Sequence, residues 1–175
     1  MSDNFELRIL KLNWLKGYDD NGTDLCLHGT IFLKIGDEIV SNPEEELTLS
    51  AAALFLLRSL RENWNPETAE NLLFPHCGHS MFPQKNSRVI VIGCDFGIDL
   101  TIHHEVNQQV RLTTLNGTSI LIAEADFQKI VLDFAQQIEK FYEKSPRKLP
   151  EDKEDLAGYE DFWQEFRQHM AVFKP

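Results

Sequence analysis

The chain has 175 residues, of which 42% are hydrophobic and 26% charged, and its formal net charge is -11. This length and composition are typical of one globular domain whose core needs no disulfide or metal to hold it together. The negative charge opposes binding to nucleic acid or to an anionic membrane. It favours a basic protein partner, or it serves only to keep the chain dispersed in solution.

The cysteine content and the first residues predict a cytoplasmic protein. The three cysteines are an odd number without the spacing of a disulfide framework, as is typical of reduced thiols in a cytosol. The N-terminal segment lacks the basic and apolar regions of a secretory signal. The longest apolar run, 51–57, is too short to span a bilayer.

The first part of the chain predicts two long strands and a short one. Alternating apolar residues begin at Phe5, and their phase shifts at Leu10, which predicts a bulge or a bend in the first strand. A second strand is expected over about 24–35, because its apolar residues share one face, and a short third strand is expected at 38–40.

A helix and a long loop follow. Thr48 or Ser50 can cap a helix that runs to about Asn63, since alanine and leucine dominate its sequence. The segment 65–87 contains three prolines and a glycine, so we expect an ordered loop there. Loops of that length are uncommon and often functional.

The second half predicts a meander of strands. Apolar alternation places His103 opposite Arg111, with a three-residue loop at 106–108 between their strands. Asn116-Gly117 then predicts a two-residue hairpin that pairs Leu112 with Leu121. The fold class expected is α+β, with an antiparallel meander sheet of about seven strands and three main helices.

Two amphipathic helices are expected at the end of the chain. Apolar residues step by three and four over 127–141 and again over 159–173. Between them, 146–158 contains prolines and mixed charge and indicates a linker. We therefore expect one α+β domain over 1–145, a linker over 146–158, and a C-terminal helix over 159–175 that packs on the domain or on a partner.

The segment His76-Cys77-Gly78-His79 is the sharpest candidate for chemistry. Imidazole nitrogen and thiolate sulfur are ligands for zinc, and Cys94 could add another ligand. A second ligand pair of the kind found in structural zinc sites is absent, so a hydrogen-bonded loop explains the same residues. These residues also leave a thiol-dependent enzyme open.

Residues for binding a partner are expected on two surfaces. His103 lies on the polar face of its predicted strand, with Asp99 on the same face and Arg111 opposite, so this face is either a partner surface or a solvated one. Trp163 in the last helix could anchor a partner or a second copy in a homodimer, because aromatic residues are favoured at interface centres. Packing on its own domain is the alternative.

No catalytic residue can be assigned from motifs. The sequence contains no GxxxxGK[ST], GxGxxG, GxSxG or HExxH. The Asp-Phe-Gly triplet at 95–97 stands without other kinase elements and is interpreted as a turn between strands.

Three segments together carry a resemblance. They are 47–60 (LTLSAAALFLLRSL), 73–78 (LFPHCG), and 92–99 (IGCDFGID) with His103. Over about residues 1–145 the chain resembles uncharacterised bacterial families that include small immunity proteins of polymorphic toxin systems. The resemblance implies a non-enzymatic cytoplasmic protein that binds and neutralises a toxin, and it implies no particular site residues.

The leading hypothesis is therefore a non-enzymatic protein-binding module without a cofactor, whose partner is a protein such as a basic toxin. The alternative is a metal-binding or thiol-dependent enzyme centred on the loop 76–79, with zinc as the candidate metal.

Overall fold

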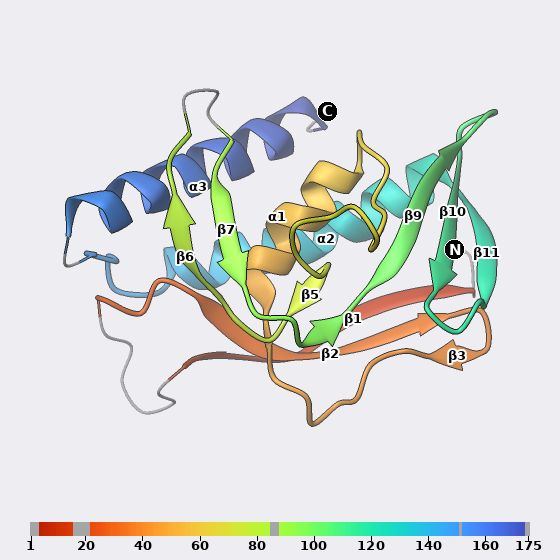
Figure 1. Cartoon of the computed structure of the whole chain (residues 1–175), viewed down its shortest axis with the longest axis horizontal. Coiled ribbons are helices and arrows are strands. Elements are labelled where there is room, and N and C mark those ends of the chain that lie inside the picture. The colour runs from red at the N-terminus through yellow and green to blue at the C-terminus, as the bar shows by residue number, and fades with distance from the viewer. Residues whose placement is uncertain (1–3, 16–21, 85–87, 151, 174–175) are drawn as a thin grey trace.

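The computed structural model describes residues 4–15, 22–84, 88–150 and 152–173 (Figure 1). The strands, in chain order, are β1 (Phe5–Trp14), β2 (Leu27–Ile35), β3 (Glu38–Ile39), β4 (Leu47–Thr48), β5 (Phe74–Pro75), β6 (Gly78–Phe82), β7 (Ile90–Gly93), β8 (Gly97–Ile98), β9 (Leu100–Glu105), β10 (Gln109–Thr114) and β11 (Ser119–Ala123). The helices are α1 (Leu49–Ser59), α2 (Glu124–Glu143) and α3 (Lys153–Val172).

The strands are antiparallel and fall into several hydrogen-bonded sheets. One sheet has the order β1-β2-β3 with β4 also paired to β2, a second has the order β11-β10-β9, and β5-β8 and β6-β7 form two-stranded pairs. The prediction of an α+β fold with three main helices is confirmed. The strands do not join into one meander sheet, and β5 and β6 lie within the segment 65–87 that the sequence analysis interprets as a loop.

The predicted irregularity in β1 is confirmed. The register of β1 on β2 shifts between Ile9 and Lys11, which leaves Leu10 as the extra residue of a bulge. Gly29 pairs with Leu12, just past this bulge, and a Cβ there would come within 2.0 Å of the Lys11 carbonyl oxygen. The close approach of β1 and β2 at this point therefore requires a glycine.

The β9–β10 register is also as predicted, whereas the β10–β11 register differs by one residue. His103 pairs with Arg111, but Leu112 pairs with Ile120 rather than with Leu121. The turn is longer than two residues because the Thr114 hydroxyl accepts a hydrogen bond from the Thr118 N–H, and Gly117 between them has a φ of 91°. Leu121 is consequently 44% exposed.

Helix α1 forms the centre of the core, and every one of its residues is buried. In Figure 1 the β6–β7 pair lies to the left of α1 and runs down from α3, α3 lies along the top, and β1 and β2 lie beneath. Thr48 is the N-cap residue but makes no side-chain cap; its hydroxyl donates instead to the His76 carbonyl, 2.9 Å away. The helix ends at Ser59, short of the predicted Asn63.

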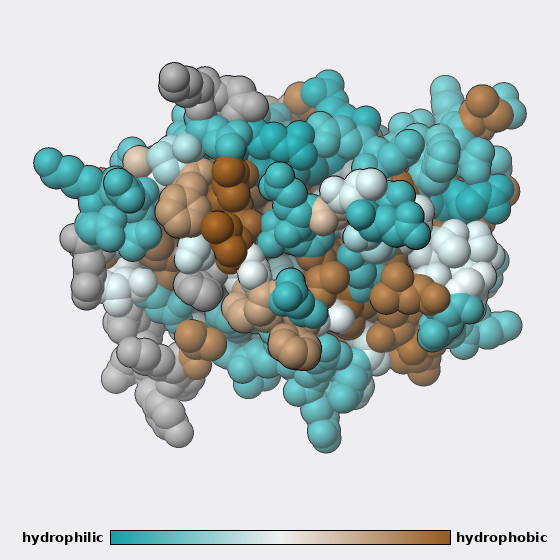
Figure 2. Space-filling view, in the orientation of Figure 1, coloured by the Kyte–Doolittle hydropathy of each residue, from teal (hydrophilic) through white to brown (hydrophobic). Residues whose placement is uncertain are grey.

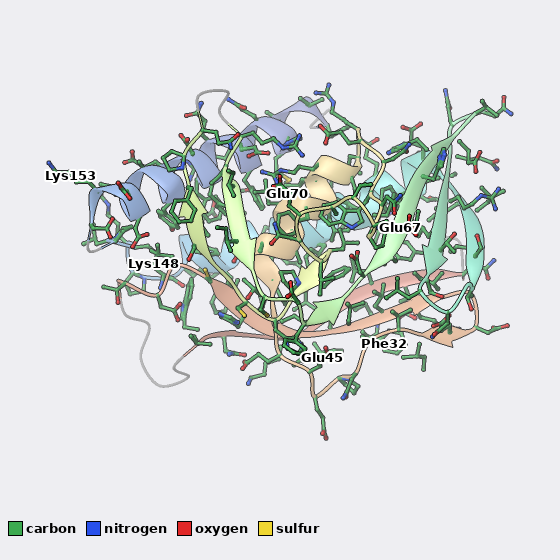
Figure 3. The ribbon with its side chains drawn as sticks, in the orientation of Figure 1. Phe32, Glu45, Glu67, Glu70, Lys148 and Lys153 are labelled. Carbon is green, nitrogen blue, oxygen red and sulfur yellow. The ribbon has the colours of Figure 1, made fainter. Side chains whose placement is uncertain are left out.

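Helix α3 begins at Lys153, so it includes part of the segment 146–158 that was interpreted as a linker. The Asp152 side chain caps the helix by accepting from the Asp155 N–H. Within the same segment Lys148 is buried, and its ammonium lies 3.2 Å from the centre of the Trp14 ring (Figure 3). A Cβ at Gly158 would lie 1.9 Å from the Met81 carbonyl oxygen, so this glycine allows α3 to pack closely on β6.

Across the described part of the chain, no helix combines the length and the apolar character that crossing a membrane requires.

Candidate functional site

Two strand pairs form one interrupted two-stranded ribbon. β5 pairs with β8 and β6 pairs with β7, and between these pairs the His76 N–H donates to the Phe96 carbonyl at 2.9 Å. Gly78 is paired with Gly93, and the neighbouring residues Cys77 and Cys94, just beyond that pair, are brought within hydrogen-bonding reach of each other. The fold thus brings together two of the residues that the sequence analysis singles out, Cys77 and Cys94.

The two thiols interact directly. The hydrogen bond between them raises the pKa of Cys77, and burial adds to the rise. Burial raises the pKa of Cys94, but the hydrogen bonds from Cys77 and from the backbone outweigh this effect, so its pKa is lowered. Both side chains are partly exposed, whereas Cys26 is buried and burial raises its pKa to about 12. Cys94 is therefore the more readily ionised thiol of the chain.

His76 is directed toward a carboxylate. Its Nε2 lies 2.6 Å from Glu45 Oε1, and its ring stacks on Phe96 at 6.4 Å between centroids. Phe96 is 69% exposed, so the contact covers only one side of its ring. Glu45 comes from the loop between β3 and β4, at the lower front of the molecule (Figure 3).

The predicted metal ligands are only partly described. The His79 side chain lies outside the described residues, although its backbone belongs to β6. His76 is occupied by Glu45, which leaves the thiols of Cys77 and Cys94 facing each other. Among the described side chains, no three from His, Cys, Asp and Glu come close enough together to hold a metal ion. The zinc hypothesis therefore gains no further ligand from this structure.

An open groove begins beside Glu45 and has a volume of about 300 Å³. We call it the acidic groove, and its lining comprises Glu38, Ile39, Val40, Glu45, Gly97, Ile98, Asp99, Thr114, Leu115 and Asn116. The Glu38 carboxylate accepts hydrogen bonds of 2.7 Å from both Thr114 and Asn116. Hydrogen bonds from Thr118, Thr114 and Asn116 lower the pKa of Glu38, so this carboxylate stays ionised at neutral pH.

Apolar side chains rim the acidic groove. Ile39 is 60% exposed and Leu115 is 71% exposed. Phe96 lies next to the groove, because it stacks on His76, which contacts the groove residue Glu45. Figure 2 shows apolar side chains over β6 and β7, and again in the region of β3 and β8, with hydrophilic side chains around them. This face therefore combines exposed apolar groups with carboxylates.

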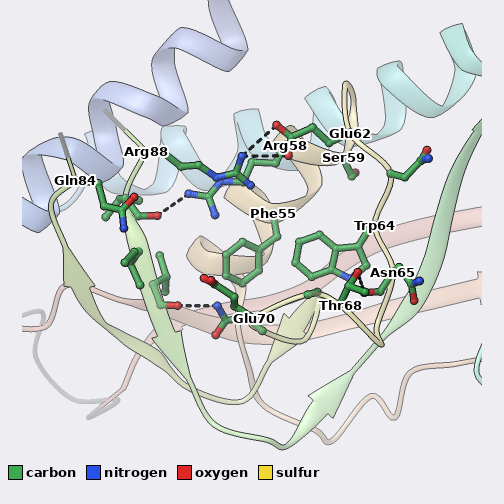
Figure 4. Close-up of a pocket in the computed structure, with 16 residues that line it drawn as sticks. Phe55, Arg58, Ser59, Glu62, Trp64, Asn65, Thr68, Glu70, Gln84 and Arg88 are labelled. Atoms are coloured by element: carbon green, nitrogen blue, oxygen red, sulfur yellow. Dashed lines mark hydrogen bonds and ion pairs between the residues drawn. The ribbon is translucent and has the colours of Figure 1, made fainter. Parts of the chain in front are cut away.

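A second cavity, of about 370 Å³, lies between the end of α1, the loop after it and β7 (Figure 4). We call it the polar cavity. Arg58 lies in its wall, but this guanidinium donates to both Glu165 oxygens, at 2.7 and 2.9 Å, and to the Val89 carbonyl. Arg88 pairs with both oxygens of Glu62 at 3.1 Å. Arg58, Arg88 and Glu62 are therefore already engaged by other groups of the chain.

His103 and Arg111 lie side by side on the outer face of the β9–β10–β11 sheet, as predicted. His103 is exposed, and Arg111 forms an ion pair of 2.7 Å with Glu105 on the same face. The structure places neither Asp99 nor Trp163 on this surface.

Asp99 and Trp163 lie in the interior and are not exposed as the partner-binding hypothesis requires. Asp99 is 3% exposed, because its Oδ1 accepts from the Trp64 indole and from backbone N–H groups. Burial raises the pKa of Asp99, and its Oδ2 has no hydrogen-bond partner among the described residues. Trp163 is 8% exposed, since it packs edge-on against Tyr142 and Phe162.

Apart from Asp99, sequence reasoning missed the residues that form the acidic groove. From the sequence, Glu44-Glu45-Glu46 is interpreted as a solvated turn and Phe96 as part of a turn between strands. One sequence signal could have pointed to the groove. Phe96 precedes Gly97 and Leu115 precedes Asn116, and a large apolar residue is not needed in a turn that only faces solvent. Comparison with known proteins adds no relative: no family model, curated protein or solved structure matches the chain.

Proposed function

We propose that the chain is a non-enzymatic binding module that holds a basic protein partner at the acidic groove, as an immunity protein holds a toxin. The observation that carries this proposal is the groove itself, where Glu38 and Glu45 lie among the exposed side chains of Ile39 and Leu115. Exposed apolar groups gain free energy when a partner covers them, and the carboxylates select a partner of positive charge.

The charges favour a partner that inserts Lys or Arg. The net charge of -11 attracts a basic protein from a distance and speeds the encounter. Glu38 is held ionised and in place by Thr114 and Asn116, so it is ready to receive a cation. A guanidinium fits best, because it can bind a carboxylate through two hydrogen bonds while its stem packs on apolar side chains.

The ribbon adds an aromatic anchor at the edge of the groove. Phe96 is stacked on His76 on one side and exposed on the other, and Glu45 holds that histidine through its 2.6 Å contact. An aromatic ring that is already fixed loses little conformational freedom when a partner covers it. Phe96 is therefore the residue of this face best suited to be a binding hot spot. A cytoplasmic location belongs to this proposal.

The test is co-expression with the product of the adjacent gene. We expect the two proteins to purify as a stoichiometric complex whose affinity falls steeply as salt is raised, and we expect this chain to protect cells from that product. No complex and no protection would contradict the proposal.

A matched pair of charge reversals locates the interface. Glu45→Lys should weaken the complex by about tenfold or more, since it places a cation where a basic partner binds. Asp133→Lys makes the same change of charge at an exposed position of α2, outside the lining of the acidic groove, and should weaken the complex far less. Equal effects would show that net charge, and not the groove, drives binding.

The metal-binding or thiol-dependent enzyme centred on 76–79 is a second candidate, favoured by the direct contact between Cys77 and Cys94. Metal analysis of the chain purified without a histidine tag tests it. A near-stoichiometric metal that is lost on His79→Ala would support this candidate, and a chain free of metal would exclude a resident metal site.

A further inference from the structure

The facing thiols of the ribbon have the arrangement from which a disulfide can form. Directly opposed residues of an antiparallel pair have Cα atoms about 4.5 or 5.5 Å apart. Both distances fall within the range of about 4.4–6.8 Å that a disulfide spans. Cys77 and Cys94 continue the pairing of Gly78 with Gly93, and their thiols are already hydrogen-bonded to each other. The bond therefore requires little movement of the backbone.

Glycines allow this close approach of the two chain segments. A Cβ at Gly93 would lie 2.6 Å from the Cys77 carbonyl oxygen, and a Cβ at Gly78 would lie 2.9 Å from the Ala51 Cβ. The Cys26 thiol also holds the ribbon by donating to the Gly78 carbonyl at 3.1 Å, and Thr48 donates to the His76 carbonyl. The two cysteines are thus fixed to the buried helix α1 on one side and exposed to reagents on the other.

We propose that Cys77 and Cys94 are a redox modification site, which a low-molecular-weight disulfide such as oxidised glutathione converts to a reversible intramolecular disulfide. This inference goes beyond the proposed binding function and does not depend on it. Cys26 takes no part, because it is buried against the ribbon.

The exchange takes place in two steps. The Cys94 thiolate attacks one sulfur of oxidised glutathione, which forms a mixed disulfide and releases one glutathione thiolate. The Cys77 sulfur then attacks Cys94 and releases the second glutathione thiolate. The two thiol protons of the protein pass to the two glutathione thiolates, so the protein loses two hydrogen atoms and one glutathione disulfide becomes two glutathione thiols.

The lowered pKa of Cys94 makes it the attacking thiol of the first step, since thiolates and not thiols react with disulfides. Cys77 then lies in the position of the resolving thiol. The bond would close residues 77–94 into a loop beside Phe96 and so tie the two halves of the ribbon together.

The experiment uses the full-length chain, first reduced and then incubated with oxidised glutathione. Intact mass should fall by two hydrogen atoms, and peptide mapping should join Cys77 to Cys94 and leave Cys26 free. The oxidised chain should melt about 5–10 °C higher than the reduced one, and dithiothreitol should reverse the change. Cys26→Ala should still lose two hydrogen atoms, whereas Cys94→Ser should not, and Cys77→Ser should stop at the glutathione adduct of Cys94.

Folding of the serine variants is checked by their melting temperature in reductant, which should stay within about 2 °C of the wild type since both side chains are partly exposed. Three free thiols after oxidation, a glutathione adduct that persists in the wild type, or a disulfide between two chains would each overturn the proposal. A lower melting temperature on oxidation would also overturn it, because it would mean that the bond distorts the ribbon.

Discussion

The polar cavity and the acidic groove are similar in size but differ in the state of their side chains. The polar cavity measures about 370 Å³ and the acidic groove about 300 Å³. In the polar cavity Arg58 is bound to Glu165 and to the backbone, and Arg88 is bound to Glu62. The acidic groove instead has Ile39 and Leu115 on its rim, each more than half exposed.

This difference is the reason for preferring the acidic groove to the polar cavity in the proposed function. A buried guanidinium that already has its partners would lose them if it turned to a ligand, and the loss would cost several kcal/mol. An exposed leucine or isoleucine has no packing to lose, so any partner that covers it gains free energy. Exposed side chains that can still gain contacts are therefore the reason for proposing the acidic groove as the binding surface, and the following changes test that proposal.

The largest loss of stability is expected when the buried ion pair of Arg58 and Glu165, in the wall of the polar cavity, is broken. Glu165→Ala leaves the Arg58 charge buried without its carboxylate and the Val89 N–H without its acceptor, so unfolding free energy should fall by about 3–5 kcal/mol. Denaturant unfolding measures this loss. Glu160→Ala, an exposed change in the same helix, should cost about 0.5 kcal/mol or less. A small effect of Glu165→Ala would mean that Arg58 is not committed to the fold.

Acid should release the same ion pair. Burial raises the pKa of Glu165, but hydrogen bonds from His169 and Arg58 outweigh it and hold the pKa at about 2, against an ordinary value of 4.5. A carboxyl whose pKa is lowered by folding stabilises the fold above its unfolded pKa, and this stabilisation is lost as pH falls. About 3 kcal/mol should therefore disappear between pH 4.5 and pH 2. Glu165→Gln should remove this part of the pH dependence, and an unchanged profile would contradict the assignment.

A smaller effect is expected at the mouth of the polar cavity. Arg88 and Glu62 are about half exposed, at 48% and 54%. Exposed ion pairs contribute about 0–1 kcal/mol, so Glu62→Ala should lower stability by no more than that, and added salt should reduce the difference further. A loss of stability as large as that of Glu165→Ala would show that the Arg88–Glu62 pair supports the fold as strongly as the Arg58–Glu165 pair does.

The smallest effect on stability is expected at the acidic groove. Leu115→Ser and Phe96→Ser remove side chains that are 71% and 69% exposed, so each should change unfolding free energy by about 0.5 kcal/mol or less. Thermal unfolding measures this directly. A large loss would show that these residues support the fold, and they would then no longer mark a binding surface.

The parts of the fold that depend on local periodicity were predictable from the sequence. Alternation along the strands determined the pairing of His103 with Arg111, and the phase shift at Leu10 located the bulge in β1. The pairing of Leu112 was predicted one residue out, because the hydrogen bond from the Thr118 N–H to the Thr114 hydroxyl lengthens the turn, and turn length decides register.

The site was less predictable because it is formed by contacts between distant segments. The sequence singled out His76, Cys77 and Cys94, but the contact of His76 with Glu45 joins residues from separate loops. The helical pattern around Arg58 did not indicate that this residue is buried. Its burial depends on the ion pair with Glu165, which lies in the last helix and far away in the sequence. Trp163 was a candidate anchor only because a helical stripe does not show what covers it.

The binding of the adjacent gene product by matched variants tests the central claim most directly. Titration calorimetry should show that Phe96→Ser and Leu115→Ser each raise the dissociation constant by about tenfold or more, as expected for anchors of an interface. Glu70→Lys at the polar cavity and Val106→Ser at the exposed β9–β10 loop should change it by about twofold or less. Loss of affinity in Glu70→Lys, with Phe96→Ser and Leu115→Ser binding as tightly as the wild type, would contradict the account.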